Sequence, residues 1–280
     1  KREHEALHYT AINGMAALRA VRGRAAGAVY GAVLGDALGA PLEFVAQPSM
    51  AAVARALALA GGGPHAVAPA QGTDDTELTL CALRGLVACD QQHGGRFVRE
   101  ALAREYHRWL QSDPVDAGMT TRAALGAPAV RLQLDPSGYR RDHGDELAPV
   151  MAAAARRRRV THGAQVLGNG ALMRVAPLGV WGCALEPNDL AAHAVADATL
   201  SHCHPVCGYA SAALALAVGA LVRTGQPASA QTVTETWLTA QDLVPADYEF
   251  VEMAAHCRSV RHAMAAWLFR GAPPPSDPVR

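Results

Sequence analysis

The sequence predicts an all-α fold, in which one domain carries functional loops between its helices. Half of the 280 residues are hydrophobic, yet only 5% are aromatic, so Ala, Leu, Val and Gly supply most of the apolar surface. Such a composition favours closely packed helices over a β-sandwich. Apolar residues recur at helical spacing along the chain, and no run of alternating β-branched residues appears anywhere. A chain of this length can bury a substantial core.

Local signals place the individual helices. Residues 1–20 are expected to form a peripheral N-terminal helix, and the small residues of 24–38 a helix that ends near Gly39, with Pro41 in the exit loop. A short Ala/Leu helix lies within residues 48–63 and ends in three glycines. Further helices are expected at about residues 77–88, 97–110, 188–200 and 205–222.

These elements predict three parts of the chain. Residues 1–23 are a peripheral helix, residues 24–270 a single helical domain, and residues 271–280 a tail whose consecutive prolines cannot continue a helix. Because the chain starts at Lys1 rather than at methionine, we expect it to be a fragment of a longer polypeptide.

Charge and cysteine usage restrict the partners. Lys and Arg balance Asp and Glu at 25 each, so no global field directs the chain to nucleic acid or to a membrane, and the run of arginines at 156–159 predicts a solvated helix end. The apolar stretch 210–222 is shorter than a bilayer requires. Six cysteines without disulfide spacing, and no charged-then-apolar leader, predict a reduced, cytoplasmic protein. Residues 202–207 only superficially resemble a zinc cluster, because they lack paired CxxC spacing.

The most informative motif is Gly-Thr-Asp-Asp-Thr at residues 72–76, directly before an apolar helical run. Two carboxylates beside two hydroxyls, with no basic residue among them, suit a hard divalent cation such as Mg²⁺, Mn²⁺ or Ca²⁺. Asp74 followed three residues later by Glu77 also has the pattern of a capping box, in which the aspartate satisfies an early helix N–H. The motif alone leaves both interpretations open.

Five segments, in order, resemble the motifs of the ADP-ribosylglycohydrolase family. They include the Gly-Asp-Ala-Leu-Gly-Ala-Pro run and the Thr-Asp-Asp-Thr motif, and they span roughly residues 24–222. The matching segments are residues 31–44, 73–76, 116–125, 168–179 and 201–205. Any one of them is weak evidence, but five in the family's order are specific.

The resemblance implies an orthogonal multi-helix bundle whose cleft holds two Mg²⁺ ions, with Mn²⁺ as an alternative. It implies metal ligation by Thr73, Asp74 and Asp75, and a metal-linked or catalytic carboxylate at Glu43. Catalysis would then fall to Glu43, Asp74 and Asp75. The implied substrate-binding residues are Gly168, Asn169, Gly170, His202 and Asp116.

Elementary chemistry is compatible with these roles but does not require them. Glycines around Asn169 would let the backbone approach a diphosphate, although Gly-Asn-Gly is also an ordinary turn. Arg174 could pair with a phosphate or, internally, with Asp36. Asp116 is first a turn or cap residue and second a ligand contact, while a hydrogen-bonded structural role is the alternative for His202.

The chain departs from the family pattern at its C-terminal end. A glycine-rich Asp-x-Asp-Thr segment normally supplies the remaining metal ligands, and none follows Val222. We therefore expect either that the natural chain continues beyond Arg280 or that catalysis is impaired. The favoured function is a Mg²⁺-dependent hydrolase that removes ADP-ribose from modified protein side chains, arginine first. The alternative is an ADP-ribose-binding or structural relative.

Overall fold

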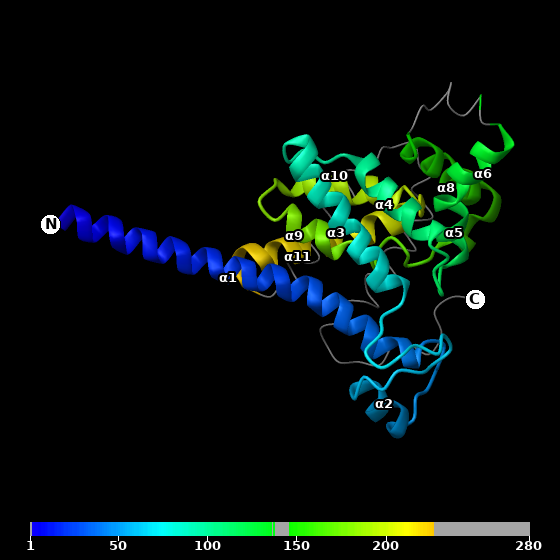
Figure 1. Cartoon of the computed structure of the whole chain (residues 1–280), viewed down its shortest axis with the longest axis horizontal. Helices are drawn as coiled ribbons and strands as arrows, with labels where there is room; N and C mark the ends of the chain where they lie inside the picture. Colours follow the sequence, from blue (N-terminus) through cyan, green and yellow to red (C-terminus); the bar gives the residue numbers. More distant parts are fainter. Residues whose placement is uncertain (1, 136, 138–145, 227–280) are drawn as a thin grey trace.

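The computed structural model describes residues 2–135, 137 and 146–226 (Figure 1). Within these ranges the regular structure consists of α-helices and two short 3-10 helices, and the only β-type pairing is an isolated bridge between Gly62 and Val67. The prediction of an all-α fold is confirmed. The predicted tail, 271–280, lies outside the described residues.

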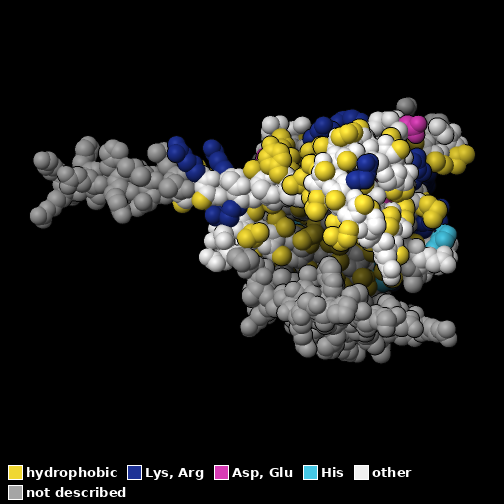
Figure 2. All heavy atoms as spheres, turned by 90° about the horizontal axis from the view of Figure 1, so that it is seen from below, with side chains coloured by type: hydrophobic (Ala, Val, Ile, Leu, Met, Phe, Trp, Pro, Cys, Tyr) yellow, Lys and Arg dark blue, Asp and Glu magenta, His cyan; other side chains and the backbone are white. Residues whose placement is uncertain are grey.

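Helix α1 (Arg2–Gly39) is continuous across residue 23, so the two helices expected at 1–20 and 24–38 are one. The division of the chain into a peripheral part and a domain stays a prediction. The N-terminal part of α1 extends away from the other helices in Figure 1, and Figure 2 shows basic side chains on the described part of α1 where it leaves the rest of the protein. Where α1 meets α11 (Pro205–Thr224), Arg24 Nε donates to the carbonyl of Val222 at 2.7 Å and Nη2 donates to that of Arg223 at 3.1 Å. A cation at these last carbonyls also complements the dipole of α11.

A short connection after α1 shapes one side of the molecule. Helix α1 ends at Gly39 as predicted, and Pro41 opens the 3-10 helix η1 (Ala40–Leu42). Helix α2 (Met50–Leu57) follows, with the hydroxyl of Ser49 accepting from the backbone N–H of Ala52 at 3.2 Å. This cap starts the helix two residues after the predicted start of the segment.

The core lies between α3 (Asp74–His93), α4 (Arg99–Gln111), α9 (Ala176–Trp181), α10 (Pro187–Ala198) and α11. A second group, α5 (Met119–Leu125), α6 (Ala127–Leu134) and α8 (Ala148–His162), continues into the 3-10 helix η2 (Gly163–Val166) and packs on α4. Leucines supply much of the buried surface: Leu78, Leu86, Leu102, Leu125, Leu178 and Leu200. The arginines at 156 and 157 are exposed near the end of α8, as a solvated helix end requires.

Two described helices are long and apolar enough to cross a membrane by length and composition: Ala17–Leu42 and Pro205–Thr224. The apolar stretch 210–222 was expected to be too short to span a bilayer. That expectation was wrong about length, because the helix that contains the stretch begins at Pro205 and has 20 residues. That helix has 61% of its apolar window buried inside the protein, against 11% for Ala17–Leu42. Its burial explains the apolar composition of α11 as that of a core helix.

Glycine allows α3 and α4 to approach closely, and this generates a stability prediction. A Cβ on Gly85 would lie 2.8 Å from Leu102 Cα, a backbone atom that cannot move alone. We expect Gly85→Ala to lower the free energy of unfolding by about 1–3 kcal/mol through overpacking. The matched control is Gly208→Ala on α11, whose Cβ would meet Val195 at an ordinary 3.5 Å and should be neutral or stabilising by up to about 1 kcal/mol. Equal unfolding midpoints in urea for the two variants would contradict this account of the contact.

Candidate active site

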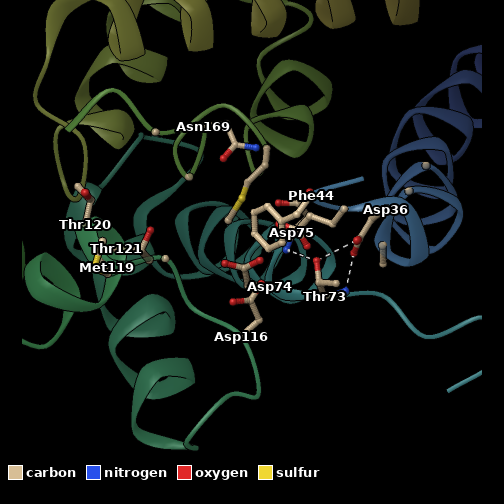
Figure 3. A pocket seen from close by; sticks show the side chains of 18 of the residues that line it. Asp36, Phe44, Thr73, Asp74, Asp75, Asp116, Met119, Thr120, Thr121 and Asn169 are labelled. Atoms are coloured by element: carbon tan, nitrogen blue, oxygen red, sulfur yellow. Dashed lines mark hydrogen bonds between the residues drawn. The ribbon is translucent and has the colours of Figure 1, made fainter. Parts of the chain in front are cut away.

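A cavity of about 560 Å³ opens where α1, α3 and α5 converge on two loops, and its volume is typical of small-molecule sites. Every residue predicted for the site from the sequence lines this cavity. These residues are Glu43, Thr73, Asp74, Asp75, Asp116, Gly168, Asn169, Gly170 and His202. The acidic residues lie on one side, and the Gly-Asn-Gly segment lies opposite them (Figure 3).

The acidic side is anchored by Asp36, which sequence analysis considered only as a partner for Arg174. Its carboxylate accepts four hydrogen bonds, from the backbone N–H and the hydroxyl of both Thr73 (2.7 and 2.9 Å) and Thr76 (3.0 and 2.6 Å). A Cβ at Gly72 would lie 2.6 Å from Asp36 Oδ2, so only glycine fits where the chain enters this turn. The end of α1 is thereby fastened to the start of α3.

The start of α3 differs from the predicted capping box. Thr73, not Asp74, is the N-cap, and its hydroxyl accepts weakly from the N–H of Asp75 at 3.4 Å. Glu77 does not reach back to the cap, because its carboxylate accepts from Trp109 Nε1 at 2.6 Å. The cap lies one residue before the predicted position, and the reciprocal contact from Glu77 is not made, so the capping-box assignment was wrong. Neither aspartate side chain caps the helix, and both line the cavity.

Burial and mutual repulsion perturb both of these aspartates. Burial raises the pKa of Asp74 to about 7, with further contributions from the charges of Asp116 and Asp75. The pKa of Asp75 is raised to about 6 by burial and by the charges of Asp36, Glu43 and Asp116. Figure 3 shows the carboxyl groups of Asp74 and Asp116 close together beside the cavity. Half-buried carboxylates that repel one another are a donor set that a divalent cation would neutralise.

The opposite side holds His202 against the glycine turn. A Cβ on Gly170 would lie 2.7 Å from both His202 Cε1 and Thr121 Oγ1, and one on Gly168 would lie 3.1 Å from His202 Nε2. The glycines therefore make room for this imidazole, a reason that the sequence did not reveal. Burial and the charge of Arg174 lower the pKa of His202 to about 3, so the ring is neutral at physiological pH.

Arg174 organises this side from below the cavity. It is fully buried, and its guanidinium donates to Asp197 Oδ2 (3.1 Å), to Ser201 Oγ (2.9 Å) and to the carbonyl of Gly170 (2.6 Å). The hydroxyl of Tyr106 donates to the same aspartate at 2.8 Å, and its ring centroid lies 4.5 Å from Arg174 Cζ. One buried cation thus fixes both the glycine turn and the residue before His202.

Both partners proposed for Arg174 from the sequence were therefore wrong. The guanidinium pairs neither with a phosphate nor with Asp36, since Asp197 on α10 occupies it. A buried aspartate in the Ala-rich second half of α10 was the available signal, and it was overlooked because it lies 23 residues from Arg174.

The family comparisons agree with this geometry. A family model described as ADP-ribosylglycohydrolase matches residues 17–279. The chain belongs to the ADP-ribosylglycohydrolase family. The ADP-ribosyl-[dinitrogen reductase] glycohydrolase of Rhodospirillum rubrum is 33% identical over 207 residues, which are 72% of this chain and 58% of that protein. The ADP-ribosylarginine hydrolase Tri1 of Serratia proteamaculans is 34% identical over 105 residues, 36% of this chain and 27% of Tri1.

A solved structure shows the same fold. A chain from an ADP-ribosylglycohydrolase-related protein complex aligns with a TM-score of 0.52 and 26% identity, covering 87% of this chain and 68% of that one. The match spans little more than half the length of the Rhodospirillum rubrum glycohydrolase. The predicted orthogonal bundle of the ADP-ribosylglycohydrolase type is confirmed.

Residues 202–207, which only superficially resemble a zinc cluster, make other contacts in the structure. The imidazole of His204 caps α11 by accepting from the N–H of Val206 at 3.3 Å, and His202 Nδ1 lies 3.0 Å from Ser201 Oγ. Cys207 Sγ donates to the carbonyl of Gly168 at 3.5 Å. The five cysteines among the described residues are free thiols. A reduced, cytoplasmic setting stays a prediction.

One residue that sequence analysis missed is His65, whose Nε2 lies 2.8 Å from Glu43 Oε2 and 3.5 Å from Asp116 Oδ2. It sits in a Gly/Pro-rich turn, where a single histidine carries no motif. Its proximity to two predicted site residues shows that the acidic side also includes a nitrogen donor.

The raised pKa values predict how the stability of the ADP-ribosylglycohydrolase chain depends on pH. Between pH ~4 and pH ~7 the folded, metal-free protein binds more protons at Asp74 and Asp75 than the unfolded chain does. The free energy of unfolding must therefore fall as pH rises through this window. We expect Asp74→Asn to have a higher Tm than the parent at about pH 8 in EDTA, and a similar Tm at about pH 4.5, where the aspartate is protonated. Equal pH profiles for the two proteins would show that Asp74 titrates normally.

Proposed function

We propose that this chain is a Mg²⁺-dependent hydrolase that removes ADP-ribose from modified protein side chains by cleaving the glycosidic bond, with arginine as the favoured side chain. The observation that carries the proposal is the arrangement of one cavity. Asp74, Asp75, the Gly-Asn-Gly turn and His202 line it together, and Figure 3 shows Asn169 across from the two aspartates, so that metal-type ligands and a candidate diphosphate cradle share one space.

The residues that would hold the cation are Asp74, Asp75 and Glu43, with a hydroxyl lone pair from Thr73. Their fit rests on charge, because the two aspartates have raised pKa values that a bound cation would reverse. An all-oxygen donor set suits Mg²⁺, and Mn²⁺ is the alternative. The family resemblance suggests two ions. When bound, such ions would supply Lewis-acid polarisation and a water of lowered pKa.

The chain's own groups would carry the remaining steps. Glu43, or one of the aspartates, would accept the proton of the attacking water, since cleavage through an oxocarbenium-like state needs a carboxylate to direct water. Backbone N–H groups around Asn169 would bind the diphosphate, because the flanking glycines leave this turn open to close approach. His202 stays neutral, so it would act as a hydrogen-bonding partner rather than as a source of charge.

Arginine is favoured as the modified side chain for two reasons. The Tri1 protein is named for ADP-ribosylarginine hydrolysis, and the glycohydrolase of Rhodospirillum rubrum for ADP-ribosyl-dinitrogen reductase. Independently, Glu43 and Asp116 line the cavity with side chains 38% and 26% exposed. Carboxylates of this kind would attract a guanidinium leaving group as it regains its full charge.

The sequence supports a second function, an ADP-ribose-binding relative with impaired catalysis. No Asp-x-Asp-Thr motif follows Val222, although the family match continues to residue 279. Losing carboxylate ligands should weaken a Mg²⁺ site strongly, because Mg²⁺ dehydrates reluctantly and demands near-octahedral geometry. Such a protein would bind ADP-ribose with little dependence on the metal.

We expect Asp74→Asn and Asp75→Asn each to reduce release of ADP-ribose from an ADP-ribosyl-arginine protein by about 100-fold or more, with the far-UV circular dichroism of the fold retained. The loss follows from the several kcal/mol that metal ligation contributes to the transition state. Asp113→Asn is the matched control, since Asp113 is exposed, does not line the cavity and has a left-handed φ of 55° that asparagine adopts readily.

EDTA separates the two functions in the same assay. Metal-dependent release that is lost in both variants supports the hydrolase. Full turnover by both variants would refute the assigned metal ligands. If the parent releases nothing but binds ADP-ribose equally with Mg²⁺ and with EDTA in calorimetry, the binding function is the correct one.

A further inference from the structure

We propose that Glu43, His65 and Asp116 form a site for a transition-metal ion, Zn²⁺ foremost, at the edge of the cavity. The three residues each offer one ligand atom, and these atoms all lie within 4.8 Å of one another. The site shares Glu43 with the proposed magnesium ligands, but its imidazole gives it a different preference. Imidazole nitrogen suits zinc, whereas carboxylate and water oxygens suit magnesium.

The distances between the ligand atoms are close to those around a bound zinc ion. His65 Nε2 lies 2.8 Å from Glu43 Oε2 and 3.5 Å from Asp116 Oδ2. Ligand atoms that surround a tetrahedral zinc at about 2.0–2.2 Å lie roughly 3.3–3.5 Å apart. Lengthening the 2.8 Å contact by about 0.5–0.7 Å, with side-chain adjustment of ligand atoms that lie up to 4.8 Å apart, would admit the ion, with water completing the coordination.

Hydrogen bonding alone leaves this cluster incomplete. Two carboxylates converge on a single ring nitrogen, and a nitrogen carries only one proton. That proton serves Glu43 at the shorter distance, while Asp116 hydrogen-bonds with the side chain of Asp74. A divalent cation in place of the proton would bind all three groups at once and neutralise the two carboxylates.

The backbone holds His65 in position. The turn that carries it is closed by two hydrogen bonds between Gly62 and Val67, N–H to carbonyl in each direction, at 2.8 and 3.1 Å. Gly63, at a φ of 73°, lies against η1, and a Cβ there would be 2.6 Å from Pro41 Cα. Because η1 leads directly to Glu43, close packing of the turn on η1 fixes the spacing between the histidine and the glutamate.

Strain next to Glu43 points the same way. Phe44 has a φ of 60°, a left-handed conformation that is costly for a bulky side chain, and its ring centroid lies 6.3 Å from that of His65. The side chains of His65, Glu43 and Asp116 are 19%, 38% and 26% exposed, which leaves them accessible to an ion.

Zinc titration of the metal-free 280-residue protein, without any ADP-ribosylated substrate, tests the proposal. Isothermal calorimetry with ZnCl₂ is compared for the parent, His65→Gln and the control His93→Gln, which removes an exposed histidine at the end of α3. We expect His65→Gln to weaken one zinc site by more than about tenfold, the lower end of what even an outer-shell partner contributes. His93→Gln should bind like the parent, and Asp116→Asn should repeat the loss if His65→Gln folds poorly.

Two further readings identify the site. X-ray absorption at the zinc edge should show only nitrogen and oxygen neighbours at about 2.0–2.2 Å, because a thiolate site would show sulfur at about 2.3 Å. The Mg²⁺ affinity of His65→Gln should change less than about threefold, since magnesium does not favour imidazole. Unchanged zinc affinity in both His65→Gln and Asp116→Asn, sulfur neighbours, or an equal loss of Mg²⁺ affinity would overturn the proposal. None of these readings depends on hydrolysis, so they are independent of the proposed function.

Discussion

The site depends on one carboxylate that never needs to touch a ligand. Asp36, near the end of α1, accepts four hydrogen bonds from Thr73 and Thr76 at the start of α3. A carboxylate with this many donors is fully satisfied, and it fixes the turn from which Asp74 and Asp75 project. Without it, two half-buried carboxylates that repel one another would have no reason to remain together. The tight glycine turn at residue 72 and the threonine hydroxyl protons therefore fix the position of the aspartates, while a lone pair of the Thr73 hydroxyl stays available to the proposed cation.

The opposite side of the cavity also depends on one buried polar interaction, here the ion pair between Arg174 and Asp197. Arg174 and Asp197 are almost completely inaccessible to solvent, and desolvating two charges offsets most of their attraction. What the pair contributes is geometry, because the remaining guanidinium donors bind the carbonyl of Gly170 and the hydroxyl of Ser201. Two polar anchors, one on each side, thus hold the walls of the cavity.

Much of this arrangement could be predicted from the sequence, and the misses have a common cause. Helical periodicity and local caps located α4, α10 and α11 to within about two residues, but α3 continues to His93, beyond its predicted end at 88, and no bounds were predicted for α6 or α8. Ordered motifs identified residues that line the cavity. Local patterns do not encode partners that are distant in the chain, so Asp197 was not recognised as the partner of Arg174. For the same reason Glu77 was assigned to a capping box, although Trp109, 32 residues away, binds it. His65 was missed because a lone histidine between glycines and alanines has no periodicity or motif.

The acidic side also gives the physical reason why the proposed function includes a cation. Folding brings Asp74, Asp75, Asp116 and Glu43 together, and the pKa values of the first two are raised, first by burial and then by the resulting repulsion. A protein accepts such a cost where the charges are compensated by something that it binds. A bound divalent ion would convert the repulsion into ligation, and proton uptake near neutral pH is the weaker alternative. Stability, pH and metal binding are therefore coupled through the same two aspartates. A chain that lacked the second acidic motif would keep this coupling, because its origin lies in residues 36–116 and not in the C-terminal segment.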